Sequence, residues 1–175
     1  MTAGQSCKRC SSTRRCSLKG PTSATCNSSK EANFDGATFH QGAEFVGAKF
    51  GPVATFVRAA FESGANFDRA SFAAISFSEA VFTDLRFFEA SFRGDANFRE
   101  ATFKGESLFA QAMFHAEVSL IKATFEGPAN LTGVTFNRGV NANEVTFQDW
   151  VGFNASTFRW SSSIIQNAFG SVSLV

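Results

Sequence analysis

Phenylalanine recurs at a nearly fixed spacing along most of this chain. From Phe34 to Phe56 the steps are 5, 6, 5 and 6 residues, and the pattern continues to the C-terminus with 26 centres, of which 22 are Phe. The residue two positions before a centre is Ala in 15 of the 26 cases. Only the stretch from Phe67 to Phe92 keeps to steps of 5. A period this regular excludes most backbone conformations.

An α-helix does not fit the repeat, because it turns by about 100° per residue and would scatter the Phe side chains around its axis. A long flat strand also fails, because a step of 5 changes the face of the sheet and a step of 6 does not. A chain that bends after every step fits both spacings. Each unit then contributes a short strand with one small and one large inward side chain, followed by a corner.

Four such units close a square coil of about 20 to 22 residues, and stacked coils pair through backbone hydrogen bonds at a spacing of about 4.8 Å. The sequence therefore predicts an all-β quadrilateral solenoid of about six and a half coils over residues 31–175. The extra residue of each six-residue step should lie at two diagonally opposite corners. The predicted structural core consists of Phe34, Phe39, Phe45, Phe50, Phe56, Phe61, Phe67, Phe72, Phe77, Phe82, Phe87, Phe92, Phe98, Phe103, Phe109 and Phe114.

The C-terminal end of this solenoid is predicted to be its weak end. The column that runs through Phe98 continues as Leu120, Ala142 and Ile164, so aromatic stacking is lost on one face. In a one-dimensional array each coil is held only by its neighbours, so poor packing favours local opening at the nearest end. The last predicted strand, from Phe169 to Val175, carries no charge that would discourage pairing of its edge. We therefore expect self-association or partner docking there.

Charge divides the chain into two parts. Residues 1–30 hold six basic residues and no acid, whereas residues 31–175 hold the other 10 basic residues and all 15 acids, a net charge of −5. The first part has too few apolar residues for a core and is predicted to be a disordered basic tail. No apolar run is long enough for a transmembrane helix, and the N-terminus lacks the apolar region of a secretory signal, so we expect a cytoplasmic protein.

All four cysteines lie in the predicted tail, at Cys7, Cys10, Cys16 and Cys26. The Cys-x-x-Cys start is typical of structural zinc sites, but the later spacing fits no standard zinc knuckle. A disordered tail, or a start codon assigned too early, is the favoured alternative to a zinc site. The Arg- and Ser-rich composition without acids also resembles a transit peptide, although no amphipathic face is present.

Few side chains in the repeat region suggest chemistry. His40 and His115 each follow a centre in distant coils and are expected to be solvated, and no nucleophile–base pair or pair of carboxylates emerges. We therefore expect no enzyme activity and no cofactor. Trp150 and Trp160 fall at two corners near the C-terminal end. They are expected either to cover the lower end of the core or to form an exposed binding patch.

The repeating motif of Ala, then Asn or Thr, then Phe and two further residues resembles the pentapeptide-repeat family. The resemblance covers residues 31–175 in tandem units, and the form with alternating steps of 5 and 6 is similar to a variant common in bacterial members. It implies a right-handed quadrilateral β-helix. Some members of the family resemble B-DNA in size and charge and protect or inhibit DNA gyrase.

Three functions follow as hypotheses. The first is a non-catalytic scaffold whose surface binds another protein, since solenoids act through their outward side chains. The second, implied by the resemblance, is DNA mimicry towards gyrase, although a duplex of the same length carries about 18 negative charges and this body has a net charge of −5. The third is a tether to a nucleic acid or membrane surface through the basic tail. Specific recognition of nucleic acid is not expected.

Overall fold

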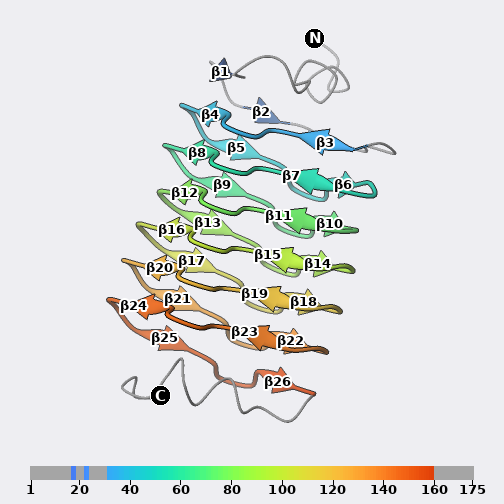
Figure 1. Ribbon diagram of the computed structural model, residues 1–175, viewed down its shortest axis with the longest axis vertical. Helices are drawn as coiled ribbons and strands as arrows, with labels where there is room; N and C mark the ends of the chain where they lie inside the picture. Colours follow the sequence, from blue (N-terminus) through green and yellow to red (C-terminus); the bar gives the residue numbers. More distant parts are fainter. Residues whose placement is uncertain (1–16, 19–21, 24–30, 160–175) are drawn as a thin grey trace.

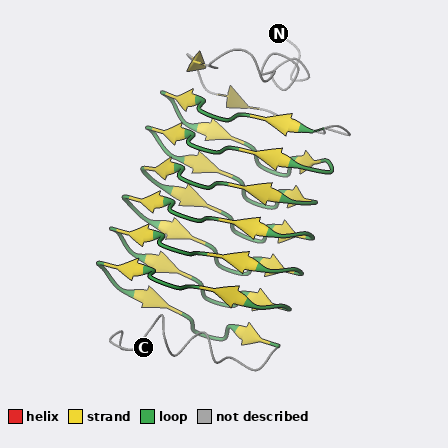
Figure 2. Ribbon diagram, viewed as in Figure 1, coloured by secondary structure: helices red, strands yellow, loops and turns green. Residues whose placement is uncertain are grey.

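The computed structural model describes residues 17–18, 22–23 and 31–159, and this part of the chain is built from strands and turns without a helix. Its 26 strands, each of two residues, form four parallel sheets. The sheets are the four faces of a rod in which the chain descends coil by coil (Figures 1 and 2). The predicted all-β quadrilateral solenoid is confirmed.

The four faces are numbered here in the order in which the chain visits them. Face 1 contains β3 (Ala32–Asn33), β7 (Ala54–Thr55), β11 (Ile75–Ser76), β15 (Ala96–Asn97), β19 (Val118–Ser119) and β23 (Val140–Asn141). Face 2 contains β1 (Ser17–Leu18), β4 (Thr38–Phe39), β8 (Ala60–Phe61), β12 (Val81–Phe82), β16 (Thr102–Phe103), β20 (Thr124–Phe125) and β24 (Thr146–Phe147).

Face 3 contains β2 (Thr22–Ser23), β5 (Ala43–Glu44), β9 (Ala65–Asn66), β13 (Leu85–Arg86), β17 (Ser107–Leu108), β21 (Ala129–Asn130) and β25 (Val151–Gly152). Face 4 contains β6 (Lys49–Phe50), β10 (Ser71–Phe72), β14 (Ser91–Phe92), β18 (Met113–Phe114), β22 (Thr135–Phe136) and β26 (Thr157–Phe158). Each strand pairs in parallel with the strand one coil further along the chain.

Two dipeptides of the predicted tail belong to these sheets. β1 pairs with β4, placing Leu18 beside Phe39, and β2 pairs with β5, placing Thr22 beside Ala43. On faces 2 and 3 the strand pairing therefore begins before residue 31, the predicted boundary, although the Phe repeat has not yet started there. The rest of the predicted tail lies outside the described residues, and its disorder stays a prediction.

The core is a set of stacked phenylalanine columns, one behind each face. Phe61 lies on Phe82 with ring centroids 4.9 Å apart, and Phe82 lies on Phe103 at 5.4 Å. Stacked rings in successive coils are 4.2 to 5.5 Å apart, close to the strand spacing. Many rings also contact rings of other columns edge-on, as Phe77 does with Phe82 of the neighbouring column at 5.4 Å and Phe67 with Phe77 of the opposite column at 5.5 Å. The small residue two positions earlier leaves room for this packing.

The corners that follow faces 1 and 3 are tight turns made by the five-residue steps. Each is closed by a backbone hydrogen bond, such as the one from the Ala37 amide to the Phe34 carbonyl at 3.0 Å. The second corner residue has a left-handed backbone conformation. It is Gly at Gly36 and Gly47 but a charged or polar residue in most other coils, including Arg58 and Gln111 with φ of 57° and 60°.

A substitution at Gly47 measures the free-energy cost of the left-handed backbone without a steric clash. Its φ is +64° and a Cβ built there meets no atom within 4 Å, so Gly47→Ala adds strain without a clash. We expect Gly47→Ala to lower the free energy of unfolding by about 1 kcal/mol, because left-handed backbone is costly for a residue with a Cβ. Ala155→Gly, at the same corner with φ 57°, should raise it. Urea titrations of both variants check the two opposite signs.

The corners that follow faces 2 and 4 are wider and lie on opposite sides of the rod (Figure 1). They have six-residue steps except between Phe72 and Phe77 and between Phe82 and Phe87, where the step is five. One coil after each of these short corners, the same corner has its usual six-residue step and carries a glycine that lies against the short corner. A Cβ on Gly94 would overlap the carbonyl oxygen of Ala73, and one on Gly105 the carbonyl oxygen of Thr83. The change of step length is therefore accommodated by glycine.

Core packing weakens towards the C-terminal end of the described rod. Phe61, Phe82 and Phe103 are at most 1% exposed, whereas Phe153 and Phe158 are only half-buried. Where Leu120 and Leu131 replace Phe, an apolar cavity of about 20 Å³ lies between Phe98, Phe109 and Phe136. The loss of aromatic stacking at these positions, predicted from the sequence, follows from the smaller Leu and Ala142 side chains.

Hydrogen exchange should follow this gradient of packing. We expect backbone amides of β24 to β26 to exchange before those of β8 to β16, since local opening begins where few apolar contacts hold a coil. Exchange measured by mass spectrometry on peptides from both regions checks this order. Equal protection along the rod would contradict it. The self-association predicted for residues 169–175 lies outside the described residues.

Candidate interaction surfaces

The described part of the chain holds no arrangement of side chains that resembles an active site. His40 and His115 are both exposed; the first lies 2.6 Å from Glu62 Oε2, and the second contacts Asn137 at 3.5 Å. No group of three His, Cys, Asp or Glu side chains that could hold a metal occurs among the described residues. None of the described segments forms a helix long and apolar enough to cross a membrane.

The outward residue of many strands serves the fold. In the repeat this position lies between the small residue and the centre, and the side-chain oxygen of Asn there accepts a hydrogen bond from the amide two residues on. Asn33 does so towards Asp35 at 2.9 Å, and Asn97 towards Arg99 at 2.9 Å. These bonds cap the tight corners, which explains why Asn is frequent between Ala and Phe.

The carboxylate of Asp68, at the corner after face 3, accepts hydrogen bonds from two residues of the next coil. Asp68 Oδ2 accepts hydrogen bonds from Arg86 Nη2 at 2.7 Å and Nε at 3.1 Å, while Oδ1 accepts one from the Phe88 amide at 3.0 Å. The hydrogen bond with Asp68 raises the pKa of Arg86 above its ordinary value. The Asp68 side chain is only 13% exposed. This pair joins two neighbouring coils and is fully engaged.

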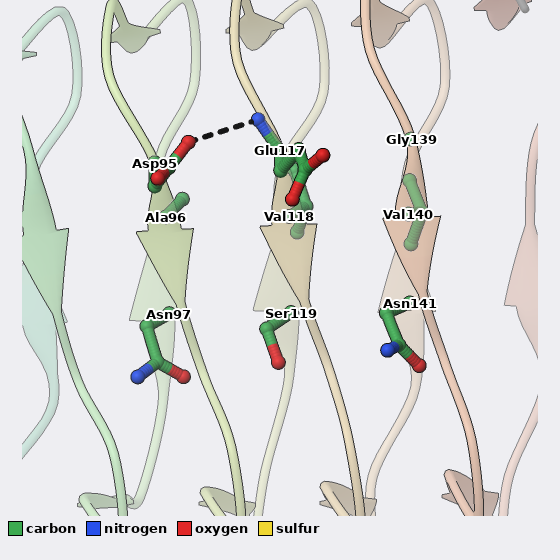
Figure 3. Close-up of a pocket in the computed structure, with 9 residues that line it drawn as sticks. All are labelled: Asp95, Ala96, Asn97, Glu117, Val118, Ser119, Gly139, Val140 and Asn141. Carbon is green, nitrogen blue, oxygen red and sulfur yellow. Dashed lines mark hydrogen bonds between the residues drawn. The ribbon is translucent and has the colours of Figure 1, made fainter.

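A shallow groove of about 540 Å³ runs along the outside of face 1, between β15, β19 and β23 (Figure 3). Asn97, Ser119 and Asn141 line one side of it, and Asp95, Glu117 and Gly139 the other. Asp95 Oδ1 accepts a hydrogen bond from the Glu117 amide at 3.3 Å, and the Asn97 and Asn141 oxygens cap corners. The acceptors of the groove are therefore largely satisfied by the fold.

The corner after face 2 carries a row of acids with one carboxylate per coil. We call it the acidic edge, and its members are Glu62, Asp84, Glu106, Glu126 and Asp149, all exposed. Lys104 is the only Lys or Arg among the described residues of this corner, so the corner has a net charge of −4, compared with −5 for residues 31–175. The Glu62 carboxylate contacts His40, and the Asp84 carboxylate accepts a hydrogen bond from the Glu106 amide. The Glu106 and Glu126 carboxylates have no such partner among the described residues.

Trp150 lies at the end of the acidic edge and is 54% exposed. Its indole ring covers the outer surface of Gly152, where a Cβ would approach the ring carbon Cζ3 to 2.9 Å. The two roles expected for Trp150, covering the core or forming an exposed patch, both stay predictions. Trp160 lies outside the described residues.

The corner after face 4, diagonally opposite, carries three exposed arginines, Arg93, Arg138 and Arg159, which we call the arginine edge, together with two exposed acids, Asp95 and Glu117. The other four arginines of the described body, at positions 58, 69, 86 and 99, each lie within 3.8 Å of a carboxylate. No described carboxylate lies within ion-pair distance of the three arginines at this edge. Met113, 42% exposed, lies beside them on face 4.

The sequence-predicted core residues and cysteines differ in what the structure shows of them. The sixteen predicted core phenylalanines are buried, each at most 4% exposed. The four cysteines of the weak zinc candidate, at positions 7, 10, 16 and 26, lie outside the described residues. The two charged edges were not found from the sequence. Successive acids of the acidic edge are 20 to 23 residues apart in the chain, and Arg93 and Arg138 are 45 apart, so the grouping becomes visible only when the charges are assigned to corners.

Comparison with known proteins identifies the family. A model described as pentapeptide repeats (9 copies) matches residues 26–71 and 77–124, more than half of the chain. The chain belongs to the pentapeptide-repeat family, as the motif predicted. No curated protein matches it.

Among solved structures, the chain is similar to trypsin-treated QnrB1, a plasmid-mediated fluoroquinolone resistance protein. The TM-score is 0.33 at 16% sequence identity, over 83% of this chain and 80% of that chain. This distant likeness concerns the fold.

Proposed function

We propose that this protein is a non-catalytic scaffold that binds a basic segment of another protein along its acidic edge. The observation that carries the proposal is the separation of charge on an otherwise regular rod. The acidic edge combines five carboxylates with the exposed indole of Trp150. Tryptophan is enriched among the residues that dominate binding energy, and a row of like charges steers an oppositely charged partner.

The fold supports this role because it holds the carboxylates in place. Glu62 and Glu126 directly follow strands of face 2, whereas Asp84 and Glu106 directly precede strands of face 3. The backbone at both positions is hydrogen-bonded from coil to coil, as the Glu126 amide is to the Phe103 carbonyl at 2.8 Å. The acids therefore repeat at about the coil spacing of 4.8 Å. A basic segment in extended conformation would meet a preformed surface, and only the long acidic side chains would lose freedom on binding.

DNA mimicry, the alternative implied by the family, is less well supported by this charge distribution. The acidic edge has one carboxylate per coil of about 4.8 Å, whereas duplex DNA has one charge per about 1.7 Å. We therefore favour a short basic protein segment over a DNA-binding enzyme as the partner. Tethering through the basic tail stays a separate hypothesis, since those residues lie outside the described part of the chain.

Selection of peptides from a random library tests the proposal. The full chain should retain peptides enriched in Lys and Arg, and these peptides should bind poorly to a variant that combines Glu106→Gln, Glu126→Gln and Trp150→Ala. Peptides without basic residues, or equal binding to the variant, would contradict it. A circular dichroism melt of the variant shows whether its fold is kept.

A further inference from the structure

The acidic edge continues the corner at which the first two strands join the rod. β1 begins face 2 and β2 begins face 3, so these strands flank the corner that carries the acidic edge in later coils (Figure 1). β1 lies two strand pairings before β8, which Glu62 follows, and six before β24, which precedes Asp149. At a coil spacing of about 4.8 Å, the acids therefore lie about 10 to 29 Å from β1 along the rod.

The sixteen residues that precede β1, which we call the N-terminal segment, match the acidic edge in charge. They contain no acid and four basic residues, in the two pairs Lys8–Arg9 and Arg14–Arg15. The corner of the acidic edge has a net charge of −4. Sixteen residues in extended conformation reach up to about 53 Å, at about 3.3 Å per residue, so the segment is long enough to pass every acid of the edge.

The two basic pairs also fall at suitable distances from β1. The nearer pair lies two to three residues before Ser17, a reach of up to about 10 Å, which corresponds to the level of Glu62. The farther pair lies eight to nine residues before Ser17, a reach of up to about 30 Å, and the levels of Glu106 and Glu126 are about 19 and 24 Å from β1. An extended segment along the edge thus brings each pair within reach of carboxylates.

The other corners offer no comparable excess of negative charge among the described residues. The corner after face 1 has four acids, but it also has three bases, and three ion pairs of 3.0 to 3.8 Å join its residues. The corner after face 3 has two acids, Asp68 and Glu89, and both contact arginine side chains. The corner after face 4 combines its acids with three arginines. The acidic edge is therefore the surface that a basic segment joined to β1 should favour.

We propose that the N-terminal segment binds along the acidic edge of its own rod and must be displaced before a basic segment of another protein can bind there. The proposal rests on the proposed function and adds its regulation. Because the segment is joined to the rod at β1, its effective concentration at the edge is of the order of millimolar, so weak contacts suffice. Exposed ion pairs depend on salt, so the contact should be lost at about 1 M salt, where the Debye length is about 3 Å.

NMR spectra of the full chain and two full-length variants test the contact. The segment-neutral variant replaces the four basic residues of the N-terminal segment: Lys8→Gln, Arg9→Gln, Arg14→Gln and Arg15→Gln. The control removes four positive charges from the rod away from the acidic edge: Arg58→Gln, Arg93→Gln, Arg138→Gln and Arg159→Gln. At about 0.01 M salt, where the Debye length is about 30 Å, the backbone amides of Glu106 and Glu126 should shift in the segment-neutral variant and not in the control. These shifts should not depend on protein concentration and should vanish at about 1 M salt.

Competition with a peptide tests the displacement. The probe is a synthetic peptide of residues 1–16 that carries three substitutions to prevent disulfides: Cys7→Ser, Cys10→Ser and Cys16→Ser. It should bind the segment-neutral variant about tenfold more tightly than the unmodified chain, the factor expected when an effective concentration of about 1 mM competes with a Kd of about 0.1 mM. The control should bind the peptide with nearly the affinity of the unmodified chain.

The outcomes separate this inference from the function on which it rests. Unchanged amides, equal affinities of the peptide for the unmodified chain and the segment-neutral variant, or shifts that grow with protein concentration would overturn the proposal. If the selected library peptides still bind the acidic edge in that case, the scaffold function stands and only the chain's own segment is removed as a competitor. Concentration-independent shifts in a chain that binds none of the library peptides would support the internal contact and count against the external partner.

Discussion

Gly94→Ala should destabilise the protein by about 3 kcal/mol, the scale of an overpacked site that cannot relax. The added Cβ would overlap the carbonyl oxygen of Ala73 and approach the Ala74 side chain in the coil above. The oxygen belongs to a backbone that is hydrogen-bonded within the sheets on either side of the corner, so it cannot move away as a flexible side chain would. Urea titration followed by circular dichroism measures the loss.

Gly139→Ala is the matched control for this prediction. Gly139 lies at the same corner of the rod, has an ordinary φ, and a Cβ built on it meets no atom within 4 Å. The change should therefore alter the free energy of unfolding by less than about 0.5 kcal/mol or raise it slightly. Equal effects of the two substitutions would show that the change from a five- to a six-residue corner does not depend on glycine.

Phe103→Ala should cost about 3–5 kcal/mol, because it leaves a cavity in a stacked column. The Phe103 ring is 1% exposed and lies 4.2 Å from Phe125 and 5.4 Å from Phe82, measured between ring centroids. Its loss removes aromatic contacts with the coils above and below. Because coils are held by their neighbours, the unfolding transition should also become broader.

Glu100→Ala serves as the control for Phe103→Ala. Glu100 is an exposed corner residue with φ 58°, and its only ion pair among the described residues is with the exposed Arg99. We expect a loss under about 0.5 kcal/mol, since alanine keeps the same backbone conformation and surface ion pairs contribute little. Comparable losses for Phe103→Ala and Glu100→Ala in denaturant titrations would contradict the register.

The fold could be predicted from the sequence because the Phe side chains, which contribute most to burial, recur at a regular spacing. Each Phe is a bulky apolar side chain without a polar group, so the positions of Phe39 and Phe45 fix which face of each unit is inside. The alternation of steps also fixes the corners: tight corners follow five-residue steps, with one residue in left-handed conformation. What the pattern did not predict is the pairing of Leu18 with Phe39, because no Phe marks that coil.

The candidate surfaces could not be predicted in the same way. Outward residues such as Glu106 or Arg138 have no requirement imposed by packing, so they follow no short-range pattern in the sequence. Their grouping depends on which corner each residue occupies, and this is known only after the strands of every coil have been assigned to faces. The short steps between Phe72 and Phe87 show why a fixed period does not suffice, because they change the coil length while strand pairing keeps each strand on its face.

Binding through the acidic edge is tested by calorimetric titration of a selected basic peptide into two matched variants of the full chain. One combines Glu106→Gln with Glu126→Gln on the acidic edge, and the other combines Glu79→Gln with Glu144→Gln on the corner after face 1. Both lose two negative charges from exposed positions. We expect the affinity for the peptide to fall by about tenfold or more, about 1.4 kcal/mol, only in the first variant. Equal affinities of the two variants would contradict it.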